Sequence, residues 1–162
     1  MATPPRVQLV FGAGGIGEGI ITHAWTTGEQ TSELLDVLKE LEITELDSAA
    51  SSPPGNPRVS ERLLGESRAA GKGFVIDTKI ERTALSGGLS EAAIDSSLKK
   101  SLELLGVKQC NILYAHFPDP NTPVEESARA FDKHYRAGLF REVRPQLTIT
   151  FWASNNLVAW LM

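Results

Sequence analysis

Short apolar runs alternate with amphipathic stretches along most of this 162-residue chain, and this alternation limits the folds that it can adopt. Runs with strand character lie at residues 7–11, 43–47, 74–79 and 111–116. Helical patterns with one apolar face lie between and after them, at 31–42, 60–71, 90–106 and 122–137. Four strand-then-helix units in succession predict an α/β fold with a parallel sheet, because parallel strands need a crossover connection that a helix supplies.

Capping residues indicate where several of these helices begin or end. Thr31 or Ser32 is the expected N-cap of the first helix, and Gly106 is expected to end the third. For the fourth helix, Thr122 is the expected N-cap and Pro123 the first helical residue.

Three ionisable residues, Asp47, Lys79 and His116, lie where three successive strands are expected to end. In a (β/α) barrel the catalytic groups come from the C-terminal ends of several strands, while the rest of each strand packs. The three side chains are therefore predicted to belong to one active site. The other two histidines, His23 and His134, have no comparable position and are expected at the surface.

A glycine fingerprint offers a second interpretation of the same α/β pattern. Gly12, Gly14 and Gly17 form G-x-G-x-x-G after the first apolar run, the spacing of a Rossmann dinucleotide-binding site. That site also needs a helix beginning at the last glycine and an acidic residue at the end of the second strand. The stretch after Gly17 lacks an apolar stripe, and Asp36, the acidic residue at about the right distance, lies inside a helical pattern. The Rossmann fold is therefore the lesser alternative.

Composition and charge disfavour several kinds of partner. The formal net charge is -4 and no basic stripe is present, so the counterion release that drives nucleic-acid binding has no source. The apolar run near the N-terminus is too short for a signal peptide, and neither a membrane-spanning segment nor a metal site is expected. A single cysteine, Cys110, cannot form an internal disulfide, which favours a reducing, cytoplasmic compartment.

Several blocks of the sequence resemble the aldo-keto reductases. The matching stretches are TELDSA, SERLLGE, FVIDTKI, SLKKSLELLGVKQCNILYAHFPDPNTPVEES and AGLFREV, in this order between residues 7 and 143. The resemblance is greatest to the aflatoxin-aldehyde reductase branch and its fungal relatives, and it implies a role in fungal secondary metabolism. It also implies a (β/α)8 barrel that binds NADPH without a Rossmann domain. The chain would contain about the first four βα units of that barrel, with residues 147–154 as a candidate fifth strand.

The family's catalytic tetrad of Asp, Tyr, Lys and His carries over in three members, Asp47, Lys79 and His116. The fourth does not, because the family motif LD-S/T-A-x-x-Y has Ser52 at the position of the tyrosine. A serine hydroxyl is too weak an acid and too short to replace the phenol that protonates the carbonyl oxygen. Tyr114 lies deeper on the same strand face as His116 and is expected to pack.

On this resemblance, residues 1–143 form the N-terminal half of a reductase barrel and residues 144–162 form a divergent apolar tail. The resemblance implies that NADPH contacts Gly12 and Asp47 and that the protein reduces small aldehydes or ketones to alcohols. Activity is expected to be impaired, because the tyrosine is replaced and most of the family's cofactor contacts come from the other half of the barrel. The alternative is a non-catalytic remnant or interaction protein. Open sheet edges also predict self-association.

Overall fold

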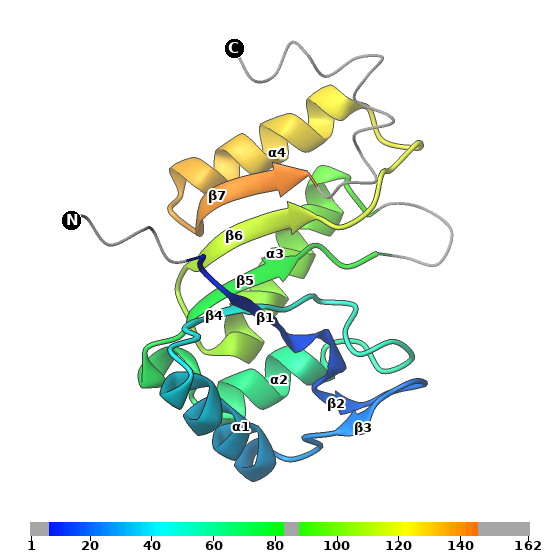
Figure 1. Cartoon of the computed structure of the whole chain (residues 1–162). Coiled ribbons are helices and arrows are strands. Elements are labelled where there is room, and N and C mark those ends of the chain that lie inside the picture. Colours follow the sequence, from blue (N-terminus) through cyan, green and yellow to red (C-terminus); the bar gives the residue numbers. More distant parts are fainter. Residues whose placement is uncertain (1–6, 83–87, 146–162) are drawn as a thin grey trace, which may run out of the picture.

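A parallel five-stranded sheet forms the centre of the computed structural model, which describes residues 7–82 and 88–145 (Figure 1). Its strands are β1 (Val10–Gly12), β4 (Glu45–Asp47), β5 (Val75–Lys79), β6 (Cys110–Ala115) and β7 (Phe140–Pro145). They lie in the order β1-β4-β5-β6-β7, and each neighbouring pair is parallel. Strand order therefore follows chain order, as in a (β/α) barrel, whereas the order of a Rossmann sheet reverses at its centre.

Helices cover the outer side of this sheet. They are α1 (Gly28–Glu40), α2 (Val59–Glu66), α3 (Glu91–Leu105) and α4 (Val124–Arg136), with short 3-10 turns η1 (Ala13–Gly15) and η2 (Ala70–Lys72). Figure 1 shows the helices following one another around the sheet, from α1 and α2 near β4 to α4 beside β7. The alternation of parallel strands and helices confirms the predicted α/β class, and its strand order is that of consecutive units of a (β/α) barrel.

The helix ends differ from the sequence prediction in three places, one of them in α2, which ends at Glu66 and not at residue 71. Helix α1 begins at Gly28, with the Thr27 hydroxyl accepting from the backbone N–H of Gln30, so the prediction of Thr31 or Ser32 as N-cap is wrong. Helix α4 has Pro123 as its N-cap residue. Thr122 is not the cap, because its hydroxyl donates to Asp119 Oδ2 at 2.7 Å. The third helix behaves as predicted, since Gly106 ends it in the left-handed conformation at φ 67°.

A fifth parallel strand, β7, lies at the edge of the sheet next to β6. β7 pairs with β6 through residues 140–145, whereas the candidate segment 147–154 lies outside the described residues. The strand also continues past the domain boundary predicted at residue 143. A second feature was not predicted at all: β2 (Gly17–Glu18) and β3 (His23–Ala24) form a small antiparallel hairpin between β1 and α1.

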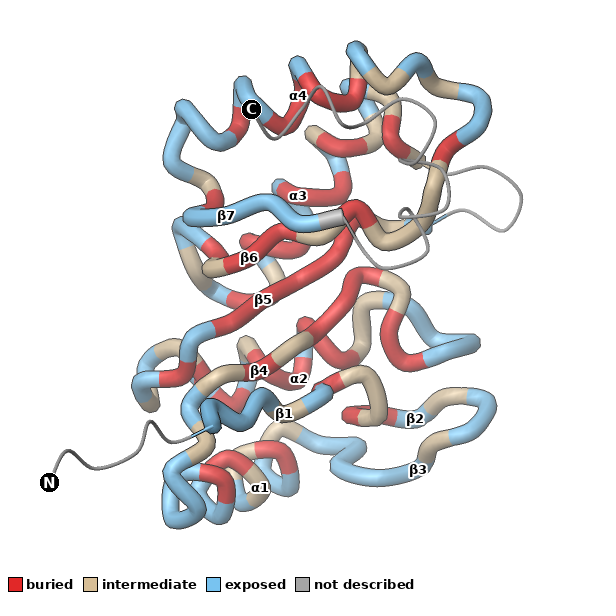
Figure 2. The backbone as a smooth tube through the Cα atoms, turned by 45° about the horizontal axis from the view of Figure 1, so that its top comes forward, coloured by how far each residue is buried: buried red, intermediate tan, exposed pale blue. Residues whose placement is uncertain are grey.

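Two apolar clusters lie between the sheet and its helices. One packs α1 and α2 against β4 and β5, and its members include Leu35, Leu46, Leu64 and Ile76. The other packs α3 and α4 against β6 and β7, and its members include Leu98, Leu113, Phe131 and Phe140. Figure 2 shows β5 buried over most of its length, whereas β1 and β7 are largely exposed because each lies at an edge of the sheet.

Three residues with reactive side chains fall into different environments. His23 is exposed, as predicted, but the prediction for His134 is wrong, because this residue is only 4% exposed. Helix α4 places His134 on the same buried face as Phe131, three residues earlier. Cys110 is buried, and burial raises the pKa of its thiol to about 12, so the thiol stays protonated at neutral pH. Within residues 7–82 and 88–145, no helix is long and apolar enough to cross a membrane.

Candidate active site

The strand register brings the predicted site residues to one end of the sheet. Gly12 at the end of β1 pairs with Asp47 at the end of β4, and Asp47 pairs in turn with Asp77 on β5. Lys79 therefore lies two residues beyond the level of Asp47, and it pairs with Tyr114 on β6. His116 directly follows β6, two residues past Tyr114. The stagger is the one expected of tilted barrel strands, so the three ionisable residues lie on neighbouring strand ends.

An ion pair between Asp47 and Lys79 is the centre of this site. Lys79 Nζ donates to Asp47 Oδ1 and, at 2.7 Å, to the backbone carbonyl oxygen of Ser48. Two backbone bonds continue the β4–β5 pairing past Asp47, from Ser48 N–H to Asp77 O and from Ala50 N–H to Lys79 O. Lys79 is 8% exposed, so its ammonium is held by fixed protein acceptors rather than by bulk water.

His116 lies beside this pair with one ring nitrogen unoccupied. Its Nδ1 is buried and has no hydrogen-bond partner in the part of the chain that the structure describes. Burial lowers the pKa of His116, and the positive charges of Lys79 and Arg82 lower it further. The ring is therefore neutral at pH 7 and retains a polar nitrogen that a bound molecule would satisfy.

Ser52, which we predicted to replace the tyrosine of the tetrad, faces Gly14. The residue is buried, and its Oγ faces Gly14, at 3.4 Å from where a Cβ on that glycine would lie. Among the described residues, no hydrogen bond joins Ser52 Oγ to Lys79 or His116.

Tyr114 carries the phenol nearest to Lys79, whose Nζ lies 5.2 Å from the ring centroid. Burial raises the pKa of Tyr114, and the nearby carboxylates of Asp77 and Asp47 raise it further. A proton donor for carbonyl reduction needs the opposite shift. The packing role predicted for Tyr114 therefore fits its environment better than a catalytic one.

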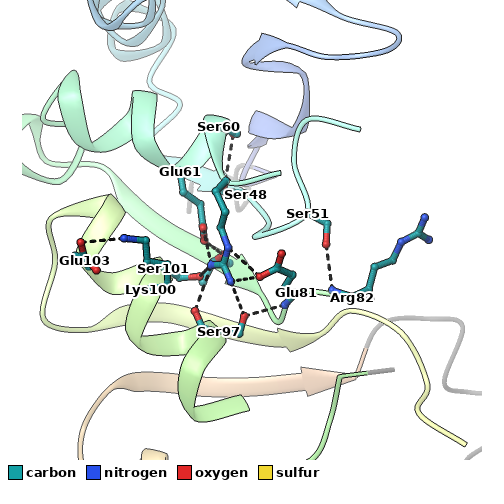
Figure 3. A network of polar contacts seen from close by, with 12 residues as sticks. Ser48, Ser51, Ser60, Glu61, Glu81, Arg82, Ser97, Lys100, Ser101 and Glu103 are labelled. Atoms are coloured by element: carbon teal, nitrogen blue, oxygen red, sulfur yellow. Dashed lines mark hydrogen bonds and ion pairs between the residues drawn. The ribbon is translucent and has the colours of Figure 1, made fainter. Parts of the chain in front are cut away.

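A second charged network lies behind the strand ends, and sequence reasoning missed it. Arg58 donates to Glu61 at 3.1 Å and to Glu81 at 2.5 Å, and the hydroxyl of Thr78 donates to Glu61 at 2.6 Å. Ser97 and Ser101 on α3 supply further acceptors for the Arg58 guanidinium. Figure 3 shows Glu61, Glu81, Ser97 and Ser101 converging from α2, the end of β5 and α3. This network ties the end of β5 to the outer helices.

The glycine fingerprint has no Rossmann role in this structure. Gly12 ends β1, Gly14 lies in the 3-10 turn η1, and Gly17 begins strand β2 at a φ of 102° rather than a helix. Asp36 lies on α1 and accepts from Lys72 Nζ at 2.6 Å. The lesser alternative of a Rossmann-type protein is therefore wrong, because Gly17 begins a strand instead of a phosphate-binding helix and the strands lie in chain order.

Known proteins were compared with the chain at the level of sequence and of structure. A sequence profile of the Aldo/keto reductase family matches residues 8–144. Oxidoreductase sirO of Leptosphaeria maculans is 34% identical over 144 residues, covering 86% of this chain and 42% of that protein. Aflatoxin B1 aldehyde reductase member 2 of Homo sapiens is 30% identical over 143 residues, covering 86% of this chain and 37% of that protein. The crystal structure of a thermostable aldo-keto reductase with the inhibitor epalrestat has a TM-score of 0.72 at 24% identity, covering 90% of this chain and 54% of that one.

The chain belongs to the aldo/keto reductase family, since the family profile matches most of its length. The structural likeness, at 24% identity, establishes the fold as that of the (β/α)8 barrel. The chain spans less than half the length of the two curated relatives described above.

Proposed function

We propose that this chain supplies the carbonyl-reducing half of an NADPH-dependent aldo-keto reductase. The observation that carries the proposal is the ion pair of Asp47 with the buried Lys79, beside the unpartnered Nδ1 of His116. Ionisable groups that converge at the C-terminal ends of parallel strands are typical of catalytic sites in this fold. The substrate would be a small aldehyde or ketone.

Each residue has a defined part in this proposal. NADPH, when bound, supplies a hydride to the carbonyl carbon. His116, which is neutral at pH 7, would hold the carbonyl oxygen by a hydrogen bond and so orient the reacting group. Lys79, held by Asp47, would stabilise the negative charge that develops on that oxygen until solvent water supplies the proton that completes the alcohol.

The space beside Gly12 is compatible with the nicotinamide end of the cofactor. Gly12 is in register with Asp47, and among residues 7–82 and 88–145, its chain neighbours aside, no atom lies within 4 Å of where a Cβ on Gly12 would be. A flat ring could therefore approach the backbone at this point, next to the Asp47 carboxylate. Gly12 and Asp47 are the residues of this chain that we assign to NADPH.

A second candidate function rests on Ser52. With serine instead of tyrosine at position 52, and with Tyr114 in a packing role, the site lacks a positioned general acid, and such a group typically contributes about 10²- to 10⁴-fold to the rate. This favours, as the alternative, a protein that keeps the family fold as a binding or interaction module without catalysing reduction. The two functions differ in whether restoring the phenol restores the reaction.

Ser52→Tyr tests the proposal directly on the 162-residue chain. If Asp47, Lys79 and His116 form a competent site, the substitution should raise NADPH-dependent reduction of an aromatic aldehyde by about 10²-fold or more. Ser52→Phe is the matched control, because it adds the same ring without the hydroxyl and should give no gain. Equal rates for the two variants, with folding verified by circular dichroism, would contradict the reductase proposal.

Cofactor binding can be measured without turnover. We expect NADPH to quench the tryptophan emission of the purified chain in a saturable way, with Asp47→Ala weakening the effect. Glu29→Ala, at an exposed position in the first turn of α1, is the control and should leave the titration unchanged. A folded chain that shows no saturable change would support the non-catalytic alternative.

The edges of the sheet also support a proposal of self-association. Within residues 7–82 and 88–145, β1 pairs only with β4 and β7 only with β6. Val143 on β7 is an exposed apolar residue on such an edge strand, which favours pairing with another chain. Light scattering should therefore show a mass that rises with concentration, and Val143→Lys should reduce it more than Val37→Lys on α1. A constant monomer mass would rule this out.

The cellular setting completes the proposal. A buried, protonated Cys110 suits a reducing compartment, so we propose that the protein acts in the cytoplasm. A role in fungal secondary metabolism is part of the proposal, and the likeness to an oxidoreductase of Leptosphaeria maculans supports the oxidoreductase part of it. Fractionation of cells that express a tagged chain would test the compartment, and recovery with membranes would contradict it.

A further inference from the structure

Arg82 lies at the mouth of the candidate site, three residues after Lys79. Its backbone N–H donates to Ser51 Oγ at 3.1 Å, which fixes the chain at this point. Its guanidinium carbon lies 4.7 Å from the centroid of the Phe117 ring. The Phe117 ring in turn lies 5.2 Å from the ring of His116. The guanidinium is therefore held on an aromatic surface next to the residue assigned to the carbonyl oxygen.

The charge of Arg82 is not compensated by an acid within the described residues. Its sequence neighbour Glu81 is directed to Arg58, with which it forms an ion pair at 2.5 Å. The other acid at the site, Asp47, pairs with Lys79. Figure 3 shows the Arg82 side chain extending away from the network that contains Glu81. Among the described residues, the N–H donors of the Arg82 guanidinium are therefore available to an anionic ligand.

A second observation points to a ligand at the same place. The Nδ1 atom of His116 is buried without a partner in the part of the chain that the structure describes. Buried polar atoms are satisfied in the large majority of native sites, so this nitrogen indicates where a polar group of a bound molecule belongs. The Phe117 ring contacts both the His116 ring and the Arg82 guanidinium. One small bound molecule could therefore reach both groups.

We propose that Arg82 determines substrate specificity by binding an anionic group, a carboxylate or a phosphate, on the carbonyl compound that His116 holds. This inference rests on the proposed function and adds the substrate class to it. A guanidinium presents a planar fork of N–H donors that matches both anions, which an ammonium does not. Stacking on Phe117 restricts the side chain beforehand, so less freedom is lost when the anion binds.

The test is a binding measurement with three matched ketones. 4-Acetylbenzoate carries a carboxylate, 4-acetylphenyl phosphate carries a phosphate, and methyl 4-acetylbenzoate is the neutral control with the same ring and carbonyl group. Ligand-observed NMR titrations of the 162-residue chain would give the three dissociation constants. We expect at least one anion to bind more tightly than the ester, and its affinity to fall as salt is added while that of the ester does not change.

Variants then assign the preference to Arg82. Arg82→Gln should weaken binding of the preferred anion by about twofold to fivefold and leave the ester unchanged, since Arg82 is exposed and an exposed charged contact is worth no more than that. Arg82→Lys should lie between, because it keeps the charge but loses the fork. Arg129→Gln removes an exposed arginine of α4 and should change nothing. Loss for the carboxylate alone or for the phosphate alone would identify the class of anion.

Three results would overturn the inference. The first is equal binding of the anionic and neutral ketones, and the second is an equal loss for both in Arg82→Gln, which would indicate a structural role. The third is no binding of any ketone by the folded chain. None of these decides the reductase proposal, which the comparison of Ser52→Tyr with Ser52→Phe tests with a neutral aldehyde.

Discussion

The two faces of β5 carry charged groups at the same end of the strand, and these groups differ in burial and in their partners. On the outer face, the Thr78 hydroxyl bonds to Glu61, which is fully buried and also pairs with Arg58. On the inner face, Lys79 pairs with Asp47, whose side chain is 37% exposed. Adjacent residues of a strand point to opposite faces, so one residue step separates the two environments.

The outer face of β5 supports the fold, whereas the inner face forms the candidate site. The outer network is closed, because Arg58, Glu61 and Glu81 satisfy one another together with hydroxyls of α3. The inner face remains open to a ligand, because His116 keeps an unpartnered nitrogen among the described residues. A closed buried network contributes to a unique structure, whereas unpaired polar groups beside an ion pair are features of a binding site.

Breaking the outer network should have the largest effect on stability. In Glu61→Ala, Arg58 and Thr78 lose a buried partner, and removing one member of a buried ion pair costs about 3 kcal/mol or more. Urea unfolding followed by circular dichroism would measure the change. Glu66→Ala is the control, since Glu66 forms an exposed pair with Arg62 on the same helix and should cost at most about 1 kcal/mol. Similar losses for both variants would mean that the network is not structural.

Removing the inner lysine should have a smaller effect on stability and a larger one on chemistry. Lys79→Met leaves Asp47 partly solvated, so we expect a loss of about 1 kcal/mol in the free energy of unfolding. In the Ser52→Tyr background the same change should remove most of the gain in carbonyl reduction, because the phenol would lose the ammonium that lowers its pKa. A destabilisation as large as that of Glu61→Ala would place the inner pair with the fold rather than the site.

The positions of Asp47, Lys79 and His116 could be predicted because each follows a short apolar run in a regular βα pattern. The outer network could not, because Arg58 reaches Ser97 and Ser101 across about forty residues of sequence that no local pattern connects. The hairpin of β2 and β3 could not be predicted for a related reason. Its strands contain two residues each, too few for a period-2 pattern.

Helix α4 shows what a closer use of periodicity would have found. Its residues Ser127, Phe131 and His134 are spaced by four and three positions, so they share one face, and all three are buried. The polar character of serine and histidine concealed this face from a count of apolar residues. The error about His134 therefore came from ranking residue type above spacing.

The smallest predicted effect concerns His134, which is buried like the outer network but less well satisfied. Its Nε2 has no hydrogen bond in the described part of the chain and lies 3.6 Å from Asp95 Oδ1 on α3. Burial lowers the pKa of His134, and Lys133 and Lys99 also lower it, whereas Asp95 and Glu91 oppose this shift. The folded protein therefore binds this proton less readily than the unfolded chain does.

The sign of the pH dependence follows from that shift. The stabilisation is fully present above the unfolded pKa near 6.5 and is lost as the pH falls from there towards the lower folded value. We expect the urea midpoint to fall between pH 7.5 and pH 5.5 in the wild type and to fall less in His134→Gln. His116 shifts in the same direction, so part of the dependence should remain. His23→Gln, at an exposed site, should behave as the wild type. If His134→Gln leaves the pH dependence unchanged, the buried histidine is already satisfied when charged, and Asp95 belongs to a closed outer network like that of Arg58.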